Sequence, residues 1–434
     1  MDILKQLKTL AEQVEVASLR TESTTVEFEA NKLKTSKVEA TSGLAVRVIR
    51  EGKLGFAASS DERALDKLSA NVLESAAYGD PVPLDFPAPQ PPPQVITYDD
   101  KITDLSIPKL VEMGQAILSH ILEVEPEVRV NISLERGISE ITVRNHTGAE
   151  AFVKRSPLSI SMQVDRIEGD DIVILFEMTG TTVWEADFMA LARQIGEKLR
   201  LARRLTNIKS GKMPVLFSPS GALVLGLPLM LGINGKNVYT GISPLRDKMS
   251  QQLFDKKISL VDDATLDGRY GSAPYDDEGM PHQRNVVIDK GQLNLFLYDL
   301  KTAALGGAKS TGNGGRSLFS PPEPAPSNLI LEAGDTPLKD MLAGIEHGLL
   351  VEDVLGLGQG NIISGAFSNP LSLAYKIEKG EIVGRVKNAS IAGNVYELLK
   401  EVSAVSQEQQ WVYNNFNLPY ILLPAMNVVA QEVG

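Results

Sequence analysis

The sequence predicts an α+β fold, with an N-terminal α+β domain of two similar helix-plus-sheet lobes and a C-terminal mainly β domain. The order helix, strands, helix occurs twice in the first half of the chain. A proline-rich segment separates the two occurrences, and glycine-rich, strand-like segments follow from about residue 212. The predicted parts are a first lobe at 1–79, a linker at 80–94, a second lobe at 95–211 and the C-terminal domain at 212–434.

A helix is expected at the start of the first lobe. Its apolar residues recur at the spacing of one helix face: Ile3, Leu7, Leu10 and Val14. Residues 24–58 alternate apolar and polar side chains instead, which predicts a short antiparallel meander with breaks at Ser42-Gly43 and Glu51-Gly52. A second helix should begin near Asp61, because aspartate is a good helix N-cap.

Prolines dominate the linker, so neither a helix nor a central strand can persist there. We expect a stiff, extended connection that crosses the surface. The alternative, a ligand for SH3-type domains, would need a free polyproline tract.

The second lobe repeats the pattern. Ser106-Ile107-Pro108 predicts a helix start, and residues 127–178 alternate as strands do. Thr182 and Glu185 have the spacing of a capping box and predict a long amphipathic helix after them.

Composition restricts the class of protein. The chain has 434 residues, no cysteine and a formal net charge of −12. The absence of cysteine excludes disulfides, thiolate nucleophiles and cysteine-containing zinc sites. The start does not read as a signal peptide, and the apolar stretch 221–233 is too short to span a bilayer. We therefore expect a cytoplasmic protein that binds no membrane and, given its acidity, no nucleic acid.

Motifs for common metal and nucleotide sites are incomplete. The four histidines, at positions 120, 146, 282 and 347, are too far apart for a paired zinc motif. Residues 306–311 imitate the end of a phosphate-binding loop, but Ala308 replaces the glycine that should precede Lys309. The glycines of 356–361 lack dinucleotide-site spacing, and an apparent calcium loop at 263–274 ends in Pro274 where glutamate is needed. We predict no metal and no cofactor.

Basic residues concentrate at 193–212, where Glu197 is the single acid. A nucleic-acid patch is conceivable there. No aromatic residues interleave for base stacking, so a solvated helix face or a domain contact is favoured.

Carboxylates are densest at Asp276, Asp277 and Glu278, just before Gly279. Three adjacent carboxylates could bind a cation or hold peptide amines. The simpler interpretation is an acidic turn whose oxygens cap backbone N–H groups.

Several long motifs around this cluster resemble the TldD/PmbA family, described as peptidase-related or as "modulator of DNA gyrase". The matching segments lie at 276–284, 297–303, 310–314, 363–368 and 377–394. The resemblance implies a two-domain subunit with a mainly β C-terminal domain.

TldD-type members carry an HExxxH zinc motif and a late cysteine ligand. The corresponding stretch here is 222–232, where an ungapped alignment puts Leu225 and Met230 near the histidine positions and Gly226 near the glutamate. The sequence is therefore similar to the PmbA/TldE branch, whose members lack the metal site. This implies pairing with a TldD-like zinc peptidase subunit around a chamber that cleaves unfolded peptides.

We therefore expect a subunit with no catalytic residues of its own, which pairs with a TldD-like chain or with a second copy of itself. Its loops are expected to shape the chamber or contact the peptide through a set of cavity residues: Asp276, Asp277, Glu278, Gly279, His282, Arg284, Thr311, Gly312, Asn313 and Gly314. Two alternatives remain. One is a regulator of DNA gyrase that binds protein or DNA, and the other is a peptidase that uses a different site around Asp276 and His282.

Overall fold

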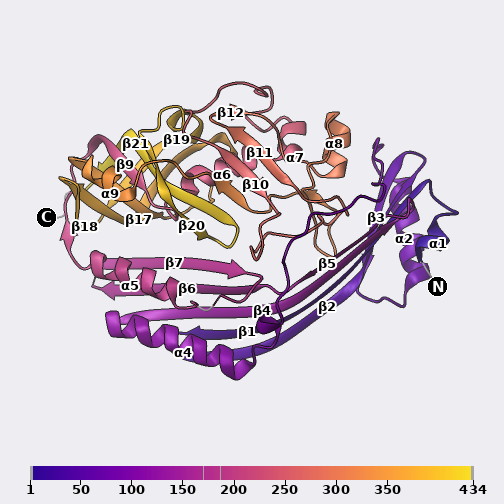
Figure 1. Ribbon diagram of the computed structural model, residues 1–434, viewed down its shortest axis with the longest axis horizontal. Helices are drawn as coiled ribbons and strands as arrows, with labels where there is room; N and C mark the ends of the chain where they lie inside the picture. Colours follow the sequence, from indigo (N-terminus) through magenta and orange to yellow (C-terminus); the bar gives the residue numbers. More distant parts are fainter. Residues whose placement is uncertain (1–2, 170, 186, 432–434) are drawn as a thin grey trace.

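The computed structural model describes residues 3–169, 171–185 and 187–431. It confirms the α+β class, with a long N-terminal sheet below a C-terminal domain (Figure 1). The N-terminal sheet has seven strands in the order β3-β2-β1-β4-β6-β7, with β5 paired to β4. Its strands are β1 Gln13–Glu29, β2 Lys32–Arg50, β3 Lys53–Ser59, β4 Val128–Asn145, β5 Glu150–Arg155, β6 Leu158–Glu168 and β7 Asp171–Thr181.

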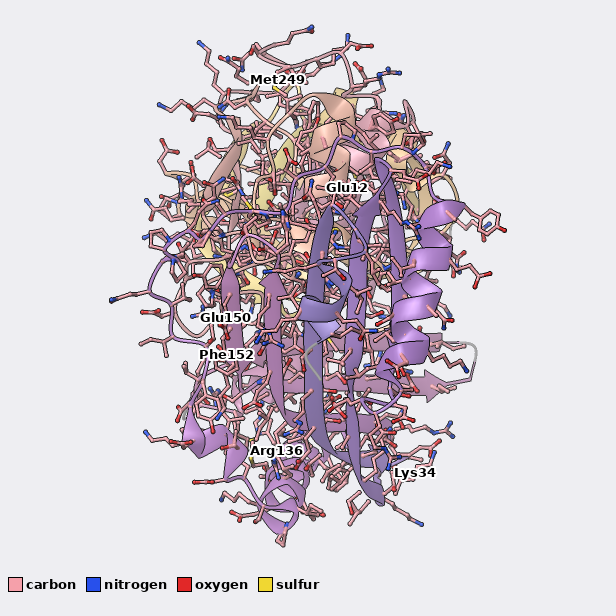
Figure 2. The ribbon with its side chains drawn as sticks, turned by 90° about the vertical axis from the view of Figure 1, so that its right-hand side faces the viewer. Glu12, Lys34, Arg136, Glu150, Phe152 and Met249 are labelled. Atoms are coloured by element: carbon pink, nitrogen blue, oxygen red, sulfur yellow. The ribbon has the colours of Figure 1, made fainter. Side chains whose placement is uncertain are left out.

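Both predicted lobes contribute to this one sheet, because β1 pairs antiparallel with β4 along most of its length. Glu12 and Lys34 mark opposite ends of the long strands (Figure 2). The helices of this half are α1 Ile3–Leu7, α2 Leu65–Ala77, α3 Asp100–Thr103, α4 Ile107–Val124 and α5 Ala190–Ala202.

The C-terminal domain is built on a twelve-stranded mixed sheet, whose main path is β12-β11-β10-β15-β21-β9-β16-β17-β18-β8. These strands and their two side branches are β8 Leu205–Thr206, β9 Gly211–Phe217, β10 Leu260–Asp263, β11 Arg284–Asp289, β12 Gln292–Leu293, β15 Leu329–Leu331, β16 His347–Val354, β17 Ala366–Glu378, β18 Glu381–Val386, β19 Ala389–Asn394, β20 Ala404–Val412 and β21 Phe416–Ala430. A separate small ribbon joins β13 Gly314–Gly315 to β14 Glu323–Pro324.

Short helices lie among these strands: α6 Leu223–Gly232, α7 Gly235–Tyr239, α8 Leu300–Gly306, α9 Leu338–Ala343, the 3-10 helix η1 Ile362–Ser364 and α10 Val395–Leu398. One apolar core belongs wholly to this domain and surrounds α6. Another joins α4 and α5 of the N-terminal half to β16 and β17. The two domains therefore share a buried apolar contact.

The predicted first helix is too long. It ends at Leu7, Leu10 is 48% exposed, and Val14 belongs to β1. Strand β1 is hydrogen-bonded on both sides, to β2 and β4, and this pairing outweighs the local helical spacing.

The first predicted turn is also wrong. Ser42-Gly43 lies inside β2, and the hairpin turns at Ala30 and Asn31, both with positive φ. Gly43 instead lets its backbone lie close to that of Ser59, since a Cβ at position 43 would lie 2.4 Å from the Ser59 carbonyl oxygen. The second turn, at Glu51-Gly52, is confirmed.

Two predicted helix starts are corrected. Helix α2 begins at Leu65, not near Asp61, and helix α5 begins at Ala190 without a capping box at Thr182. The helix start predicted at Ser106-Ile107-Pro108 is confirmed, and Ser106 is its N-cap, because its hydroxyl accepts a hydrogen bond from the Lys109 N–H at 3.3 Å.

Residues 80–94 form neither helix nor strand, but they are anchored to the N-terminal sheet. Val82, Leu84 and Phe86 are buried. The Gln13 side chain donates to the Leu84 carbonyl at 2.9 Å and accepts from the Phe86 N–H at 2.8 Å. The linker is therefore a packed strap, not a loose connection.

Candidate functional site

The acidic loop, residues 275–281, is a tight turn held by its own first carboxylate. One Asp276 oxygen accepts hydrogen bonds from the N–H groups of Glu278 and Met280, both at 2.9 Å. The other accepts from the Gly314 N–H at 2.9 Å. Asp276 therefore organises the backbone, as the simpler interpretation of the acidic cluster requires.

Glu278 ties this loop to the N-terminal sheet. Its Oε1 accepts from Arg47 of β2 at 2.6 Å, and its Oε2 accepts from the Leu300 N–H at 2.6 Å. Arg47 also forms a two-pronged pair with Glu15 of β1, and Arg316 binds the same Glu15 at 2.6 Å. Two carboxylates and two guanidinium groups thus form one buried network between the domains.

The carboxylates in and beside this network have pKa values shifted in opposite directions. Burial alone would raise the pKa of Glu15, but the nearby Arg316 and Arg47 outweigh it and lower that pKa. Burial raises the pKa of Glu278 despite its pair with Arg47. Burial, followed by the charge of Glu278, raises the pKa of Asp276 well above its ordinary value.

A second polar network positions the loop that carries Asn313. The Asn313 amide donates to Asp262 of β10 at 2.6 Å, and its carbonyl oxygen accepts from Thr311 at 2.7 Å and Asn285 at 3.1 Å. Burial raises the pKa of Asp262 to about 6. These interactions place Gly314 against the acidic loop, within hydrogen-bond reach of Asp276.

Between the domains lies a cavity of about 250 Å³, called here the interdomain cavity. Strands β4 and β5 supply one wall, and the acidic loop, the Asn313 loop and residues 325–327 supply the others. Its polar lining comprises Arg155, Tyr270, Tyr275, Asp276, Asp277, His282, Asn313, Ser327 and Asn415. Burial lowers the pKa of His282 to about 4, so its imidazole is neutral near neutral pH.

The acidic loop also borders a second cavity of about 430 Å³. Glu278 and Gly279 lie on that side, opposite the linker residues Pro87 to Pro91, and Tyr275 lines both cavities. The Tyr275 hydroxyl donates to the Gln90 carbonyl at 3.0 Å. The loop and the linker therefore contact each other directly.

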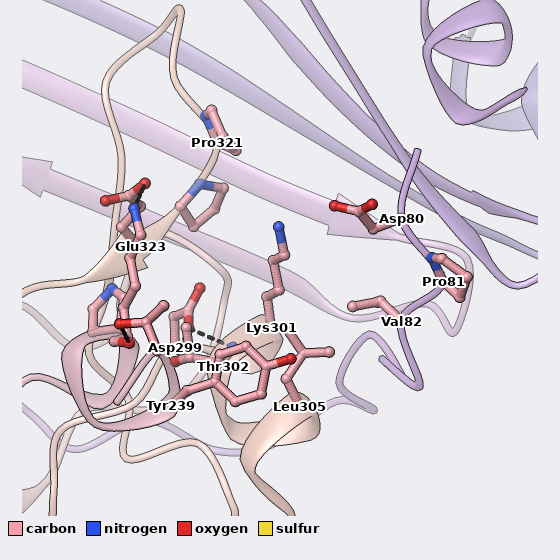
Figure 3. Close-up of a pocket in the computed structure, with 14 residues that line it drawn as sticks. Asp80, Pro81, Val82, Tyr239, Asp299, Lys301, Thr302, Leu305, Pro321 and Glu323 are labelled. Atoms are coloured by element: carbon pink, nitrogen blue, oxygen red, sulfur yellow. Dashed lines mark hydrogen bonds and ion pairs between the residues drawn. The ribbon is translucent and has the colours of Figure 1, made fainter. Parts of the chain in front are cut away.

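A third cavity, of about 300 Å³, lies where the linker meets α7 and α8. The Lys301 side chain extends into it from α8, between the linker residues and the loop that carries Pro321 (Figure 3). None of the residues predicted as site residues lines it.

The predicted site residues separate into four groups. Those on the interdomain cavity are Asp276, Asp277, His282, Asn313 and Gly314, and those on the second cavity are Glu278 and Gly279. Thr311 and Gly312 are buried without lining either of these two cavities. Arg284 lies apart on the surface, paired with Glu332 at 2.6 Å.

Sequence reasoning missed the charged residues of the N-terminal sheet that lie near the acidic loop. Arg47 and Glu15 are single charges within alternating strands, and Arg155 follows Lys154 at the end of β5. Such residues ordinarily point to solvent, and only the pairing of distant strands shows that Arg47 and Glu15 are buried and that Arg155 is half-buried. Arg316 follows the glycines of the Asn313 loop, where no pattern distinguished it from a surface arginine.

Helix α6 occupies the stretch that was compared with the zinc motif. Leu225 and Gly226 are buried and Met230 is half-buried, and no residue of Leu223–Gly232 carries a nitrogen, oxygen or sulfur group that ordinarily binds zinc. No three His, Asp or Glu side chains of the described residues gather as a metal site. The residues present at α6 do not fit a zinc ion.

Four of the seven basic residues of 193–212 pair with acids within the described residues. Lys198 is buried between Glu177 and Glu352, and Arg203 pairs with Glu125 at 3.0 Å. Arg193 and Arg200 pair with Asp187 and Glu197. This arrangement matches the domain-contact interpretation better than a free basic patch.

None of the helices within the described ranges is both long enough and apolar enough to cross a bilayer.

Two family models match the chain. The model of the PmbA/TldA metallopeptidase C-terminal domain matches residues 210–430, and that of PmbA/TldA metallopeptidase domain 1 matches residues 14–76. An uncharacterised protein of Methanocaldococcus jannaschii is 27% identical over 409 residues, or 92% of each chain. A metalloprotease TldD homologue of Haemophilus influenzae is 33% identical over 203 residues, which cover 46% of this chain and 42% of that protein.

Solved structures show the same fold over the whole chain. TldE from Thermococcus kodakarensis has a TM-score of 0.89 at 23% identity and covers 99% of both chains. A protein from Thermotoga maritima that carries the name of a DNA gyrase modulator has a TM-score of 0.89 at 22% identity, covering 98% of this chain and 99% of that one.

Proposed function

The chain belongs to the TldD/PmbA metallopeptidase family, and from that membership we propose that it is a TldE-like subunit without a zinc site of its own. In this proposal it pairs with a TldD-like zinc peptidase subunit, and the two enclose a chamber where unfolded peptides are cleaved at the partner's metal. The cytoplasmic location expected from the sequence is part of the same proposal.

The observation that supports this proposal most strongly is the apolar composition of α6. Family members of the TldD type need two histidines and a glutamate on one helix, because the imidazoles bind the metal and the carboxylate activates its water. The buried residues of Leu223–Gly232 are apolar here, and the sequence contains no cysteine for a late ligand. The acidic loop offers no substitute, because Asp276 and Glu278 are engaged with backbone N–H groups and Arg47.

The experiment compares the purified chain alone with the chain mixed with a TldD-like subunit. Alone, it should retain far less than one zinc per chain after dialysis and should not cleave an unfolded casein substrate. The mixture should cleave it, and a chelator should stop the cleavage. Stoichiometric zinc and chelator-sensitive cleavage by the chain alone would overturn the proposal.

The variants Asp276→Asn and His282→Gln test the alternative peptidase site around the acidic loop. Any cleavage by the pure chain that both variants abolish, while their unfolding curves match the wild type, would support that alternative. If such cleavage is absent or unchanged in the variants, the acidic loop is not a peptidase site.

Partner choice is tested by light scattering and by co-purification. A particle of twice 47.0 kDa from the chain alone indicates a homodimer, whereas a 47.0 kDa particle restricts the proposal to the heteromer. Recovery of a TldD-like chain with the native protein would support the heteromeric form.

Regulation of DNA gyrase is the other function considered. Among the described residues, four of the seven basic side chains of 193–212 are paired with acids, which leaves only Arg204, Lys209 and Lys212 for a contact with DNA. A duplex titration at low and moderate salt would restore this alternative only if it revealed steeply salt-dependent binding.

A further inference from the structure

The interdomain cavity is lined by two opposite charges that are not paired with each other. Arg155 of β5 contributes a guanidinium group on one wall, and Asp277 of the acidic loop contributes a carboxylate on another. Neither residue forms an ion pair with any other residue in the described part of the chain. Their interaction is only a longer-range electrostatic one.

Arg155 contacts an aromatic ring, but its buried Nε lacks a hydrogen-bond partner among the described residues. Its guanidinium lies 5.9 Å from the centre of the Tyr270 ring, and its Nε is buried with no hydrogen-bond partner in the described part of the chain. Arg155 lines the interdomain cavity, and a buried polar group in such a place is normally hydrogen-bonded, so the lack of a partner for its Nε among the described residues indicates a missing occupant.

Asp277 retains acceptor capacity as well. One of its oxygens accepts from the Arg316 backbone N–H at 2.9 Å, and among the described residues no other hydrogen bond reaches this carboxylate. An ionised carboxylate has about four acceptor positions, so most of them remain free for a ligand. Asp276 differs, because three backbone N–H groups already occupy its oxygens.

We propose that the interdomain cavity binds a small zwitterion with a free α-ammonium and a free α-carboxylate, of the size of an amino acid or a dipeptide. The carboxylate of this ligand meets Arg155, and its ammonium meets Asp277. A ligand of this kind pairs both half-buried charges at once, whereas each of them is costly to remove from water without a partner.

The lining excludes simpler ligands. A pure anion would face the carboxylates of Asp276 and Asp277, and a pure cation would face Arg155. Burial raises the pKa of Asp277 and lowers that of Arg155, as expected for charges that lack a close partner. The volume of about 250 Å³ is slightly below the range of about 300–1,000 Å³ that is typical for drug-sized ligands, so the occupant is small.

Such zwitterions are the end products of peptide hydrolysis. Only this identification of the ligand as a product rests on the proposed function, whereas the binding site itself rests on the cavity. The test therefore uses the full-length chain alone, with no partner and no peptidase assay. Failure of binding would leave the proposed function standing, and failure of the proposed function would leave binding measurable.

The test is isothermal titration calorimetry near neutral pH with alanyl-alanine and three capped forms of it. We expect saturable binding of alanyl-alanine. Its N-acetyl form, its C-terminal amide and its doubly capped form should each bind at least about ten-fold more weakly, because each loses a charged hydrogen bond. Free alanine distinguishes an amino acid site from a dipeptide site.

Two variants assign the ends of the ligand. Arg155→Gln should make alanyl-alanine and its amide bind equally, whereas Asp277→Asn should make alanyl-alanine and its N-acetyl form bind equally. Lys154→Gln is the matched control, because the side chain of Lys154 lies over the Tyr98 ring and does not line the cavity. This variant should leave the affinities for alanyl-alanine and its capped forms in the same ratios as in the wild type.

The ligand series keeps the test decisive even if a variant fails to fold. No saturable heat with the wild type up to about 10 mM alanyl-alanine would overturn the proposal, because the cavity would then hold water only. Equal affinity for the doubly capped dipeptide would also overturn it, because charge would then play no part.

Discussion

Arg47 and Glu278 lie 231 positions apart in the sequence and form a buried ion pair at 2.6 Å between the N-terminal sheet and the acidic loop. Arg47 is 1% exposed and Glu278 is fully buried. Together with Glu15 and Arg316, this pair holds the loop that borders both the interdomain cavity and the second cavity.

Replacing Arg47 by methionine should destabilise the protein strongly. Arg47→Met removes the only guanidinium that contacts Glu278 among the described residues and leaves that buried carboxylate without an ion-pair partner. Breaking a buried pair in this way costs about 3–5 kcal/mol. Urea unfolding followed by circular dichroism measures the loss. The control Lys34→Met breaks an exposed pair with Glu29 and should leave the midpoint unchanged; equal midpoints for both variants would contradict the prediction.

Two glycines should respond oppositely to alanine. A Cβ at Gly314 would lie 2.5 Å from a carboxylate oxygen of Glu278 and 2.6 Å from its Cγ, so Gly314→Ala forces the buried network to move. Overpacking of this kind costs about 1–3 kcal/mol. Gly226 in α6 has no atom within 4 Å of its added Cβ, so Gly226→Ala should stabilise the helix by about 0.5–1 kcal/mol. Chemical unfolding of the two variants side by side checks the opposite signs.

The fold class could be predicted from the sequence because periodicity is a local property. The alternation of 127–178 and the Ser106 cap were visible in short windows, and both are confirmed. The first helix was overestimated for the same reason, since the pairing of β1 with β4 involves residues more than a hundred positions away. Local spacing cannot report a hydrogen-bond ladder with a distant strand.

The candidate site was only half predictable. Asp276 to Glu278 were noticed because three acids stand together, which is a local signal. Arg47 and Arg155 carry no such signal, because each lies in a strand far along the sequence from the acidic loop and comes near it only when the domains meet. The chemistry of the interdomain cavity therefore depends on residues that only the tertiary structure identifies.

Asp353 should make stability fall as pH rises. Burial raises its pKa from 3.8 to about 6, so between these values the folded protein keeps a proton that the unfolded chain has released. Its contribution to the free energy of unfolding therefore decreases from about pH 4 to about pH 7, by up to about 3 kcal/mol. Asp353→Asn keeps an oxygen for the Val354 N–H and removes the titration.

Unfolding free energies of wild type and Asp353→Asn at several pH values test this. The advantage of the variant should grow from about pH 4 to about pH 7. Val354→Ala, at the neighbouring position, removes no titrating group, so its difference from wild type should stay constant across the same range. If the difference for Asp353→Asn is constant as well, the Asp353 carboxylate of the wild type has the same pKa in the folded and the unfolded protein, and the prediction is wrong.

Gln13 should control access of proteases to the linker. Its side chain makes three hydrogen bonds with residues 84–86: to the Leu84 carbonyl at 2.9 Å, to the Asp85 carboxylate at 2.8 Å and from the Phe86 N–H at 2.8 Å. Gln13→Ala removes all three, at about 1 kcal/mol each, and should favour local opening of the strap. Cleavage after the buried Leu84 by chymotrypsin should then be at least roughly ten-fold faster, because the rate follows the population of the open form.

The control is Gln90→Ala, in the exposed part of the same linker. Among the described residues this substitution removes no side-chain hydrogen bond, so the variant should be cleaved at the wild-type rate. If Gln13→Ala is also cleaved at that rate, buried Val82, Leu84 and Phe86 hold the linker without help from Gln13.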